Sequence, residues 1–239
     1  MVHDEATGCT AAVDTPEVGP ILSILAEKKW SLTHILNTHH HWDHTGGNEE
    51  LIAKFPDVEV VVPKSEAHKI KGKISRGVEG GDTLKVGSID FEVMDVGGHT
   101  LGHVAYYAPA CKAAFVGDSI FALGCGRMFE GDYDQFSKSL ERIKNLPDDT
   151  LLYCAHEYTA ANAKFALTVE KNNQDLLDRV EDIKEKRSKN LPTVPTTVAL
   201  EKATNPFIRL QAAKQALGLA DDLDDVAIFK TIRKLKDNF

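Results

Sequence analysis

The chain has 239 residues, of which 42% are hydrophobic and 27% charged, and these are values of an ordinary globular protein with a sizeable core. Its formal net charge of −8 argues against a general nucleic-acid binder, whose footprint would be a broad basic face. No apolar run approaches the roughly 18 residues of a membrane helix. Because residues 1–5 contain neither a basic nor an apolar signal region, we expect no secretory signal, and four cysteines without CxxC spacing indicate reduced thiols. We therefore expect an intracellular protein with no membrane or nucleic-acid partner.

Short strands and helices alternate along the first two thirds of the chain. In chain order the patterns predict a helix over 18–30, a buried strand over 33–37, strands over 91–96 and 113–116, a helix over 135–146 capped by Asp132 or Asp134, and a strand over 151–154. From residue 169 onward only helical spacing remains, around 176–183, 200–217 and 226–236, with a proline-punctuated connector over 191–197. The chain thus divides into an αβ part, 1–168, and a helical part, 169–239.

The most informative motif follows the predicted strand 33–37 and reads Thr-His-His-His-Trp-Asp-His. It contains four candidate metal ligands: His39, His41, Asp43 and His44. Imidazole and carboxylate are the side chains that hold borderline divalent metals. Alternate positions cannot all converge on one face of a helix, so we expect these ligands on a strand-to-helix loop. Trp42 is expected to pack beneath that loop.

Three further donors come after predicted strands: His99, Asp118 and His156. Together with the motif they give five histidines and two aspartates from four strand ends. This count is too large for one tetrahedral zinc and suits two metals that share a bridging ligand. His103 lies within a strand-like stretch, and we expect it to be structural.

With these residues the chain resembles the metallo-β-lactamase superfamily, whose signature is Thr-His-x-His-x-Asp-His followed by His, Asp and His. Within it, the chain resembles the glyoxalase II (hydroxyacylglutathione hydrolase) family. The more specific marks are the segments 117–121, 124–131, 154–159 and 205–207. The resemblance implies an α+β fold: a four-layer αβ/βα sandwich over 1–168, without the usual N-terminal strand, and an α-helical substrate-binding domain over 169–239.

The resemblance also implies a ligand set for two divalent ions, of zinc, iron or manganese. His39, His41 and His99 would hold the first ion, Asp43, His44 and His156 the second, and Asp118 would bridge them. Asp43 and Asp118 are the expected catalytic residues. A hydroxide between the two ions would attack the thioester carbonyl, and the thiol leaving group, with a pKa of about 8.5, would need no dedicated acid.

The expected substrate is an S-(2-hydroxyacyl)glutathione thioester, such as S-D-lactoylglutathione, which is converted to D-lactate and glutathione. By resemblance its glutathione half would be bound by Arg127, Phe129, Tyr158, Arg233 and Lys236. Arg233 and Lys236 are i,i+3 neighbours on the last predicted helix, so they share one face. We expect a monomer in the cytoplasm or the mitochondrial matrix.

Two alternatives remain open from the sequence. A persulfide dioxygenase of the same superfamily uses a single iron with open positions for oxygen, and the complete second ligand set argues against it. A non-catalytic metal-binding protein of the same fold is disfavoured because all seven ligands are present. Metal content per chain, oxygen consumption and a thioester assay would distinguish the three.

Overall fold

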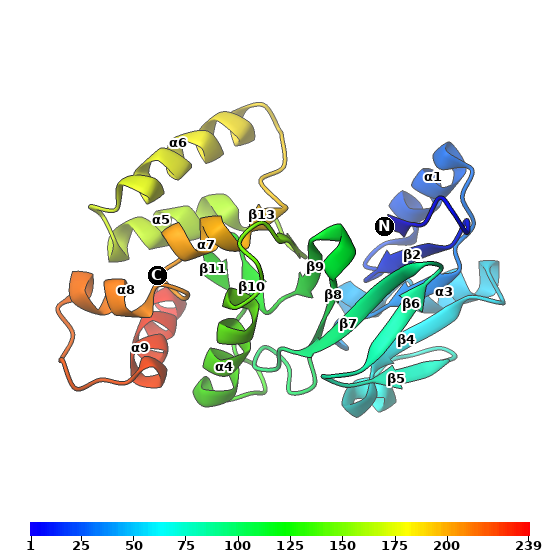
Figure 1. The fold of residues 1–239 in the computed structure, drawn as a ribbon, viewed down its shortest axis with the longest axis horizontal. Helices are drawn as coiled ribbons and strands as arrows, with labels where there is room; N and C mark the ends of the chain where they lie inside the picture. Colours follow the sequence, from blue (N-terminus) through cyan, green and yellow to red (C-terminus); the bar gives the residue numbers. More distant parts are fainter. The chain divides into compact units, whose positions relative to one another are not determined.

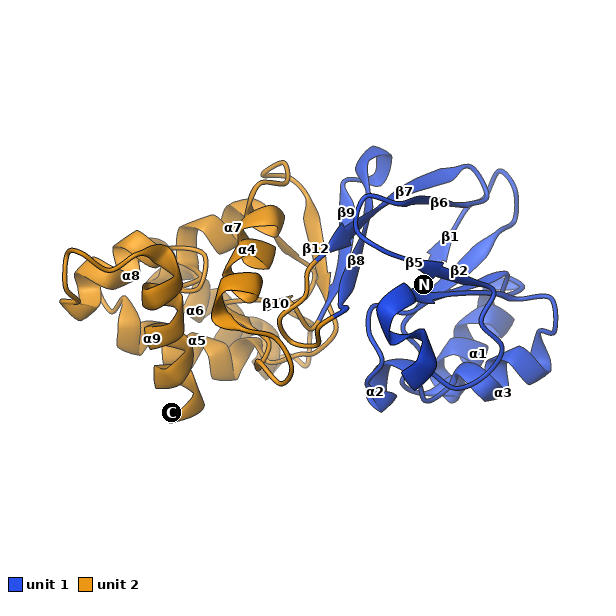
Figure 2. Ribbon diagram, turned by 90° about the horizontal axis from the view of Figure 1, so that it is seen from below, with its two compact units in different colours: residues 1–95, 102–117 blue, residues 96–101, 118–239 orange.

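The computed structural model describes residues 1–239, which fall into two compact units. Figure 2 shows unit 1 in blue, residues 1–95 and 102–117, and unit 2 in orange, residues 96–101 and 118–239. Unit 1 holds most of the strands, whereas unit 2 holds most of the helices. No helix of the chain combines the length and the apolar character that crossing a bilayer requires.

Unit 1 contains a five-stranded sheet in the order β1-β2-β3-β4-β5. Its strands are β1 (Val2–His3), β2 (Thr10–Val13), β3 (His34–Leu36), β4 (Glu59–Pro63) and β5 (Arg76–Val78). The pairs β2–β3, β3–β4 and β4–β5 are parallel, and β1 is antiparallel to β2. Parallel strands are usually covered on both faces, which explains the unbroken apolar run in β4.

An antiparallel meander forms the second sheet region of unit 1. It consists of β6 (Thr83–Val86), β7 (Ile89–Asp95), β8 (Val104–Ala108) and β9 (Ala113–Gly117). Buried and exposed residues alternate in β6, as expected for a strand with one solvated face. Leu84, Phe91 and Tyr106 of this meander pack against Leu36 and Val61 of the first sheet. The two sheet regions therefore enclose one core.

Helices, some of them labelled in Figure 1, cover the face of the five-stranded sheet that lies opposite the meander, as Figure 2 shows. Unit 1 has helices α1 (Val18–Lys28), α2 (Trp42–Thr45) and α3 (Asn48–Lys54), and 3-10 turns η1 (Lys64–Lys69) and η2 (Pro109–Cys111). Leu25 of α1 and Leu51 of α3 pack against Ile35 and Val60. Because Ile35 and Leu36 are neighbours in β3 and face opposite cores, this strand is buried on both sides.

Unit 2 is predominantly helical. Its elements are the hairpin β10 (Ile120–Phe121) and β11 (Gly124–Cys125), the pair β12 (Leu151–Cys154) and β13 (Thr196–Thr197), and the helices α4 (Tyr133–Lys144), α5 (Thr159–Val169), α6 (Gln174–Ser188), α7 (Val198–Thr204), α8 (Leu210–Leu217) and α9 (Asp225–Asp237). Leu123 packs with Ala163, Leu176 and Ile183 in one core cluster. Elsewhere the ring of Phe229 contacts those of Phe136 and Phe207.

Most predicted elements are confirmed within a few residues, and the α+β class is confirmed. Asp132, not Asp134, caps α4, because its carboxylate accepts a hydrogen bond from the Gln135 amide. Two predictions for the helical part are wrong. The helix expected over 200–217 is split into α7 and α8 around Pro206, and residues 196–197 form the strand β13.

Candidate metal centre

Unit 1 supplies the four donors of the histidine-rich motif. His39 and His41 lie on the loop after β3, and the Nε2 atom of His39 is 3.0 Å from Nδ1 of His41. Asp43 and His44 lie on α2, with 3.9 Å between Asp43 Oδ2 and His44 Nε2. The prediction of a loop is therefore correct for the first two donors and wrong for the last two. The short helix α2 directly follows the loop, so Asp43 and His44 still lie near His39 and His41.

Asp14, which the sequence did not single out, holds this motif in place. Its carboxylate accepts hydrogen bonds from the Thr38 amide and hydroxyl, both at 2.8 Å, and from His44 Nδ1 at 2.7 Å. His44 therefore keeps Nε2 available for a metal. The Thr38 hydroxyl donates to Asp14, so it accepts from His39 Nδ1 at 3.0 Å, and that ring likewise keeps Nε2 free of a proton.

Unit 2 contains the three later candidate donors, and within it Asp118 stands between His99 and His156. Its Oδ2 is 3.4 Å from His99 Nε2, and its Oδ1 is 3.4 Å from His156 Nε2. Two ligand atoms on one tetrahedral ion, each at about 2.0–2.2 Å, are about 3.3–3.6 Å apart. Each carboxylate oxygen thus has the separation expected for sharing an ion with a different histidine. This is the arrangement that a bridging carboxylate requires.

The backbone of residues 125–131 orients His99. Nδ1 of His99 donates to the Arg127 carbonyl at 2.7 Å, which leaves Nε2 facing Asp118. The Phe129 amide donates to the His99 carbonyl, and the Phe129 ring meets the imidazole edge-on at 5.3 Å. A backbone carbonyl behind a ligating histidine is a common way to set its tautomer.

Aromatic rings orient His156. The Tyr158 ring stacks on the imidazole with centroids 4.9 Å apart, and Phe121 packs edge-on against both rings. Phe121 is buried, whereas Tyr158 is 49% exposed. Tyr158 can therefore support His156 with one face and meet a ligand with its remaining surface.

Three further residues in and near the motif have different environments. Trp42 is 76% exposed, so the prediction that it packs beneath the loop is wrong. His40 Nδ1 lies 2.8 Å from the buried carboxylate of Glu66, which also accepts from the backbone amides of His40 and Gly102. His103 is buried and stacks on His39 with 4.6 Å between centroids.

The five candidate glutathione contacts belong to unit 2 and differ in accessibility. Phe129 is 63% exposed, while Arg233 is only 3% exposed. The guanidinium of Arg233 contacts Asp237 and the carbonyls of Cys125 and Gly126. Lys236 is half-buried, and burial together with the nearby charge of Arg233 lowers its pKa. None of these contacts tests substrate binding, so the assignment stays a prediction.

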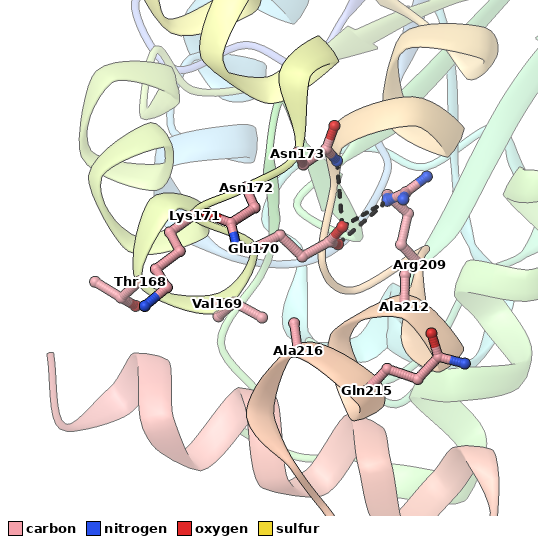
Figure 3. Close-up of a pocket in the computed structure, with 10 residues that line it drawn as sticks. All are labelled: Thr168, Val169, Glu170, Lys171, Asn172, Asn173, Arg209, Ala212, Gln215 and Ala216. Atoms are coloured by element: carbon pink, nitrogen blue, oxygen red, sulfur yellow. Dashed lines mark hydrogen bonds and ion pairs between the residues drawn. The ribbon is translucent and has the colours of Figure 1, made fainter.

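A separate hollow of about 590 Å³ lies between the end of α5 and helix α8 (Figure 3). Glu170, the one acidic residue that lines it, forms an ion pair with Arg209 at 3.1 Å and accepts a hydrogen bond from Asn173. None of the predicted site residues lines it. Because Glu170 is already paired with Arg209, the hollow contributes no further candidate metal ligand.

The donor chemistry fits metal binding. The chain contains groups of side chains that could hold metal ions, and three of them consist of His and Asp residues from the seven predicted ligands. Nδ1 of both His44 and His99 is engaged in a hydrogen bond, so Nε2 is the atom that each could offer to a metal. Imidazole with carboxylate suits zinc, iron and manganese alike.

Comparison with known proteins gives a consistent result. Residues 7–156 match the model of the metallo-beta-lactamase superfamily, and residues 157–239 match that of the hydroxyacylglutathione hydrolase C-terminus. The chain is 47% identical to a hydroxyacylglutathione hydrolase of Maricaulis maris and 48% identical to one of Rhizobium meliloti, in each case over 100% of this chain and 93% of the relative. Among solved structures, ETHE1 from Myxococcus xanthus covers 98% of this chain and 92% of its own, with 26% identity and a TM-score of 0.64. The BLEG-1 B3 metallo-beta-lactamase, at 20% identity and a TM-score of 0.65, covers 87% of this chain and 91% of its own and shows the shared fold.

Proposed function

Because the chain belongs to the hydroxyacylglutathione hydrolases of the metallo-beta-lactamase superfamily, we propose that it hydrolyses S-(2-hydroxyacyl)glutathione thioesters. S-D-lactoylglutathione, which yields D-lactate and glutathione, is the proposed substrate. The observation that carries the proposal is similarity over the whole chain, since both the metal-binding part and the C-terminal part match. The arrangement of Asp118 between two histidines supports it from the chemistry.

The proposed site holds two divalent ions. His39, His41 and His99 would hold the first, Asp43, His44 and His156 would hold the second, and Asp118 would bridge them. When bound, such ions lower the pKa of water from about 15.7 towards about 7 and polarise a carbonyl oxygen. Asp118 is suited to the bridge because each of its oxygens faces a different histidine.

The remaining roles belong to the chain's own side chains. Asp43, which is partly exposed on α2, would orient the attacking water and accept its proton. The leaving glutathione departs as a thiolate, because a thiol with a pKa of about 8.5 needs no strong acid. Arg127, Tyr158, Arg233 and Lys236 offer the donors that two glutathione carboxylates call for, and Phe129 offers an exposed ring.

In this proposal, metal binding and glutathione binding belong to different parts of the chain. Residues 1–168 would carry the metals, and residues 169–239 would bind the glutathione half. We expect the chain to act as a monomer inside the cell, in the cytoplasm or the mitochondrial matrix. Sedimentation of the purified protein tests the first point, and localisation of the tagged full-length protein tests the second.

The direct test is the release of glutathione from S-D-lactoylglutathione by the metal-loaded protein, followed with a thiol reagent. A control reaction with S-methylglutathione, a thioether without an acyl group on its sulfur, should release none. Oxygen consumption with glutathione persulfide is measured in parallel. Thioester hydrolysis without oxygen uptake is expected. Oxygen uptake without hydrolysis would assign the chain to the dioxygenase alternative. If neither activity is detected, the non-catalytic metal-binding alternative would be favoured.

A further inference from the structure

Arg233 of α9 is an unusually buried cation for a residue expected to meet a substrate. Its side chain is 4% exposed, and its Nε and Nη2 atoms lie 3.1 and 2.9 Å from Asp237 Oδ1. The plane of the guanidinium lies near the Phe207 ring, with Cζ 5.2 Å from the centroid. A buried charge must be compensated by fixed partners, so the contacts of Arg233 are not easily exchanged.

The other end of the guanidinium contacts the backbone at the end of β11. Nη1 lies 3.2 Å from the Cys125 carbonyl and 3.5 Å from the Gly126 carbonyl, and 3.6 Å from Cys125 Sγ. Burial raises the pKa of the Cys125 thiol to about 11, so the thiol is neutral at neutral pH. The backbone carbonyls, and not a thiolate, therefore complete the solvation of the cation together with Asp237.

The segment held by Arg233 is the one that orients His99. One residue further on, the Arg127 carbonyl accepts from His99 Nδ1 at 2.7 Å. Gly126 is packed so closely that an added Cβ would lie 2.0 Å from the Asp118 carbonyl oxygen and 3.1 Å from His99 Nδ1. A shift of this backbone by a few tenths of an ångström would therefore press directly on two predicted metal ligands.

We propose that Arg233 is a positioning residue for the metal centre: from the C-terminal helix it fixes the Cys125–Arg127 backbone, which in turn sets the orientation of His99. This role is additional to the binding of glutathione, and it rests on the proposed function in taking His99 as a ligand. It makes the helical part of the chain necessary for full metal affinity. A residue that contacts only the substrate would have no such effect.

The test compares Arg233→Met with Lys234→Met. Methionine keeps the length of the side chain and removes the guanidinium fork, while Lys234 is an exposed cation on the same helix. Zinc affinity is measured by competition with a chelator, and thermal unfolding of the metal-free proteins is recorded alongside. Loss of a partner that orients a ligating histidine typically weakens metal binding by about 10- to 100-fold. We expect about tenfold for one ion per chain in Arg233→Met and no change in Lys234→Met.

Two further measurements keep the test decisive. If Arg233→Met does not fold, Arg233→Lys takes its place, because lysine restores the charge but not the fork; its expected loss is severalfold, and wild-type affinity would overturn the proposal. Unchanged zinc affinity with a raised KM alone would also overturn it. The His99 Nδ1 proton, followed by NMR in the metal-free protein, should lose its hydrogen-bonded shift in the variant. That signal remains readable even if the proposed hydrolysis is not found, so the two failures are distinguishable.

Discussion

Replacement of Asp14 by asparagine should weaken metal binding without disturbing the fold. Asp14 has a φ of 54°, a left-handed conformation that asparagine also tolerates. The amide keeps one oxygen to accept from the Thr38 amide, which lies 2.8 Å from Oδ1 in the native protein. Its nitrogen cannot accept from the Thr38 hydroxyl or from His44 Nδ1, which lie 2.8 and 2.7 Å from Oδ2.

The size of the effect follows from the two lost contacts. Hydrogen bonds to a charged group contribute about 1.5–3 kcal/mol each. Partners that orient a ligating histidine typically change metal affinity by about 10- to 100-fold, which is about 1.4–2.7 kcal/mol. His44 loses its hydrogen-bond acceptor directly. His39 keeps the Thr38 hydroxyl as its partner, but this hydroxyl loses the Asp14 oxygen that fixes its orientation. We therefore expect weaker binding by both ligand sets.

Chelator competition and metal analysis of purified protein measure this effect. Asp4→Asn is the matched control, because Asp4 is also a buried, hydrogen-bonded aspartate but contacts Thr7 and Ser88 instead of the motif. Thr38→Val should weaken the His39 set more than the His44 set, since Asp14 still reaches His44. Wild-type affinity for both ions in Asp14→Asn would refute the reasoning.

Three further predictions concern stability and substrate binding. Glu201→Ala should lower the free energy of unfolding in urea by about 3–5 kcal/mol, because the largely buried guanidinium of Arg179, whose Nη2 atom lies 2.6 Å from the Glu201 carboxylate, loses its only carboxylate partner and keeps hydroxyl and carbonyl partners alone; a loss below about 1 kcal/mol would contradict this. Lys236→Met should raise KM for the thioester about 10- to 100-fold, less at high salt, and leave kcat unchanged, whereas a fall in kcat alone would speak against a remote carboxylate contact. Hydrogen bonds from Thr7 and Ser88 lower the pKa of Asp4 well below its usual value, so its stabilising effect is complete above about pH 4 and fades as the pH falls towards the lowered pKa. The difference in melting temperature between wild type and Asp4→Asn should therefore shrink from pH 7 to pH 3, and a constant difference would contradict this account.

The sequence predicted the donor set because strand ends are where side chains converge. The strand before His39 and the three later strands could be recognised from their apolar residues. The structure has the corresponding strands β3, β7, β9 and β12 within a few residues of the predicted ranges. Asp14 and Glu66 were missed because a single acid carries no pattern of its own. A signal for Asp14 existed: it directly follows β2, the parallel neighbour of β3, so it lies at the same edge of the sheet as the motif.

Burial could not be predicted where it depends on distant partners. The i,i+3 spacing of Arg233 and Lys236 correctly places both on α9, but it does not reveal that Arg233 reaches the carbonyls of Cys125 and Gly126. Similarly, a tryptophan between metal ligands suggested packing, yet α2 directs Trp42 into solvent. The strand β13 is two residues long and exists because it pairs with β12, which local periodicity cannot show.

The central claim is that Asp118 bridges two metal ions that the hydrolysis requires. Metal content per chain, measured on the same samples as the hydrolysis of S-D-lactoylglutathione, tests it most directly in wild type and Asp118→Ala, with the exposed Asp90→Ala as control. We predict two ions per chain and full hydrolysis in wild type and control. In Asp118→Ala both sites should lose metal, and activity should fall by several orders of magnitude, because activation of water and stabilisation of the oxyanion are lost together. An Asp118→Ala protein that retains two ions and near-normal turnover would contradict the claim.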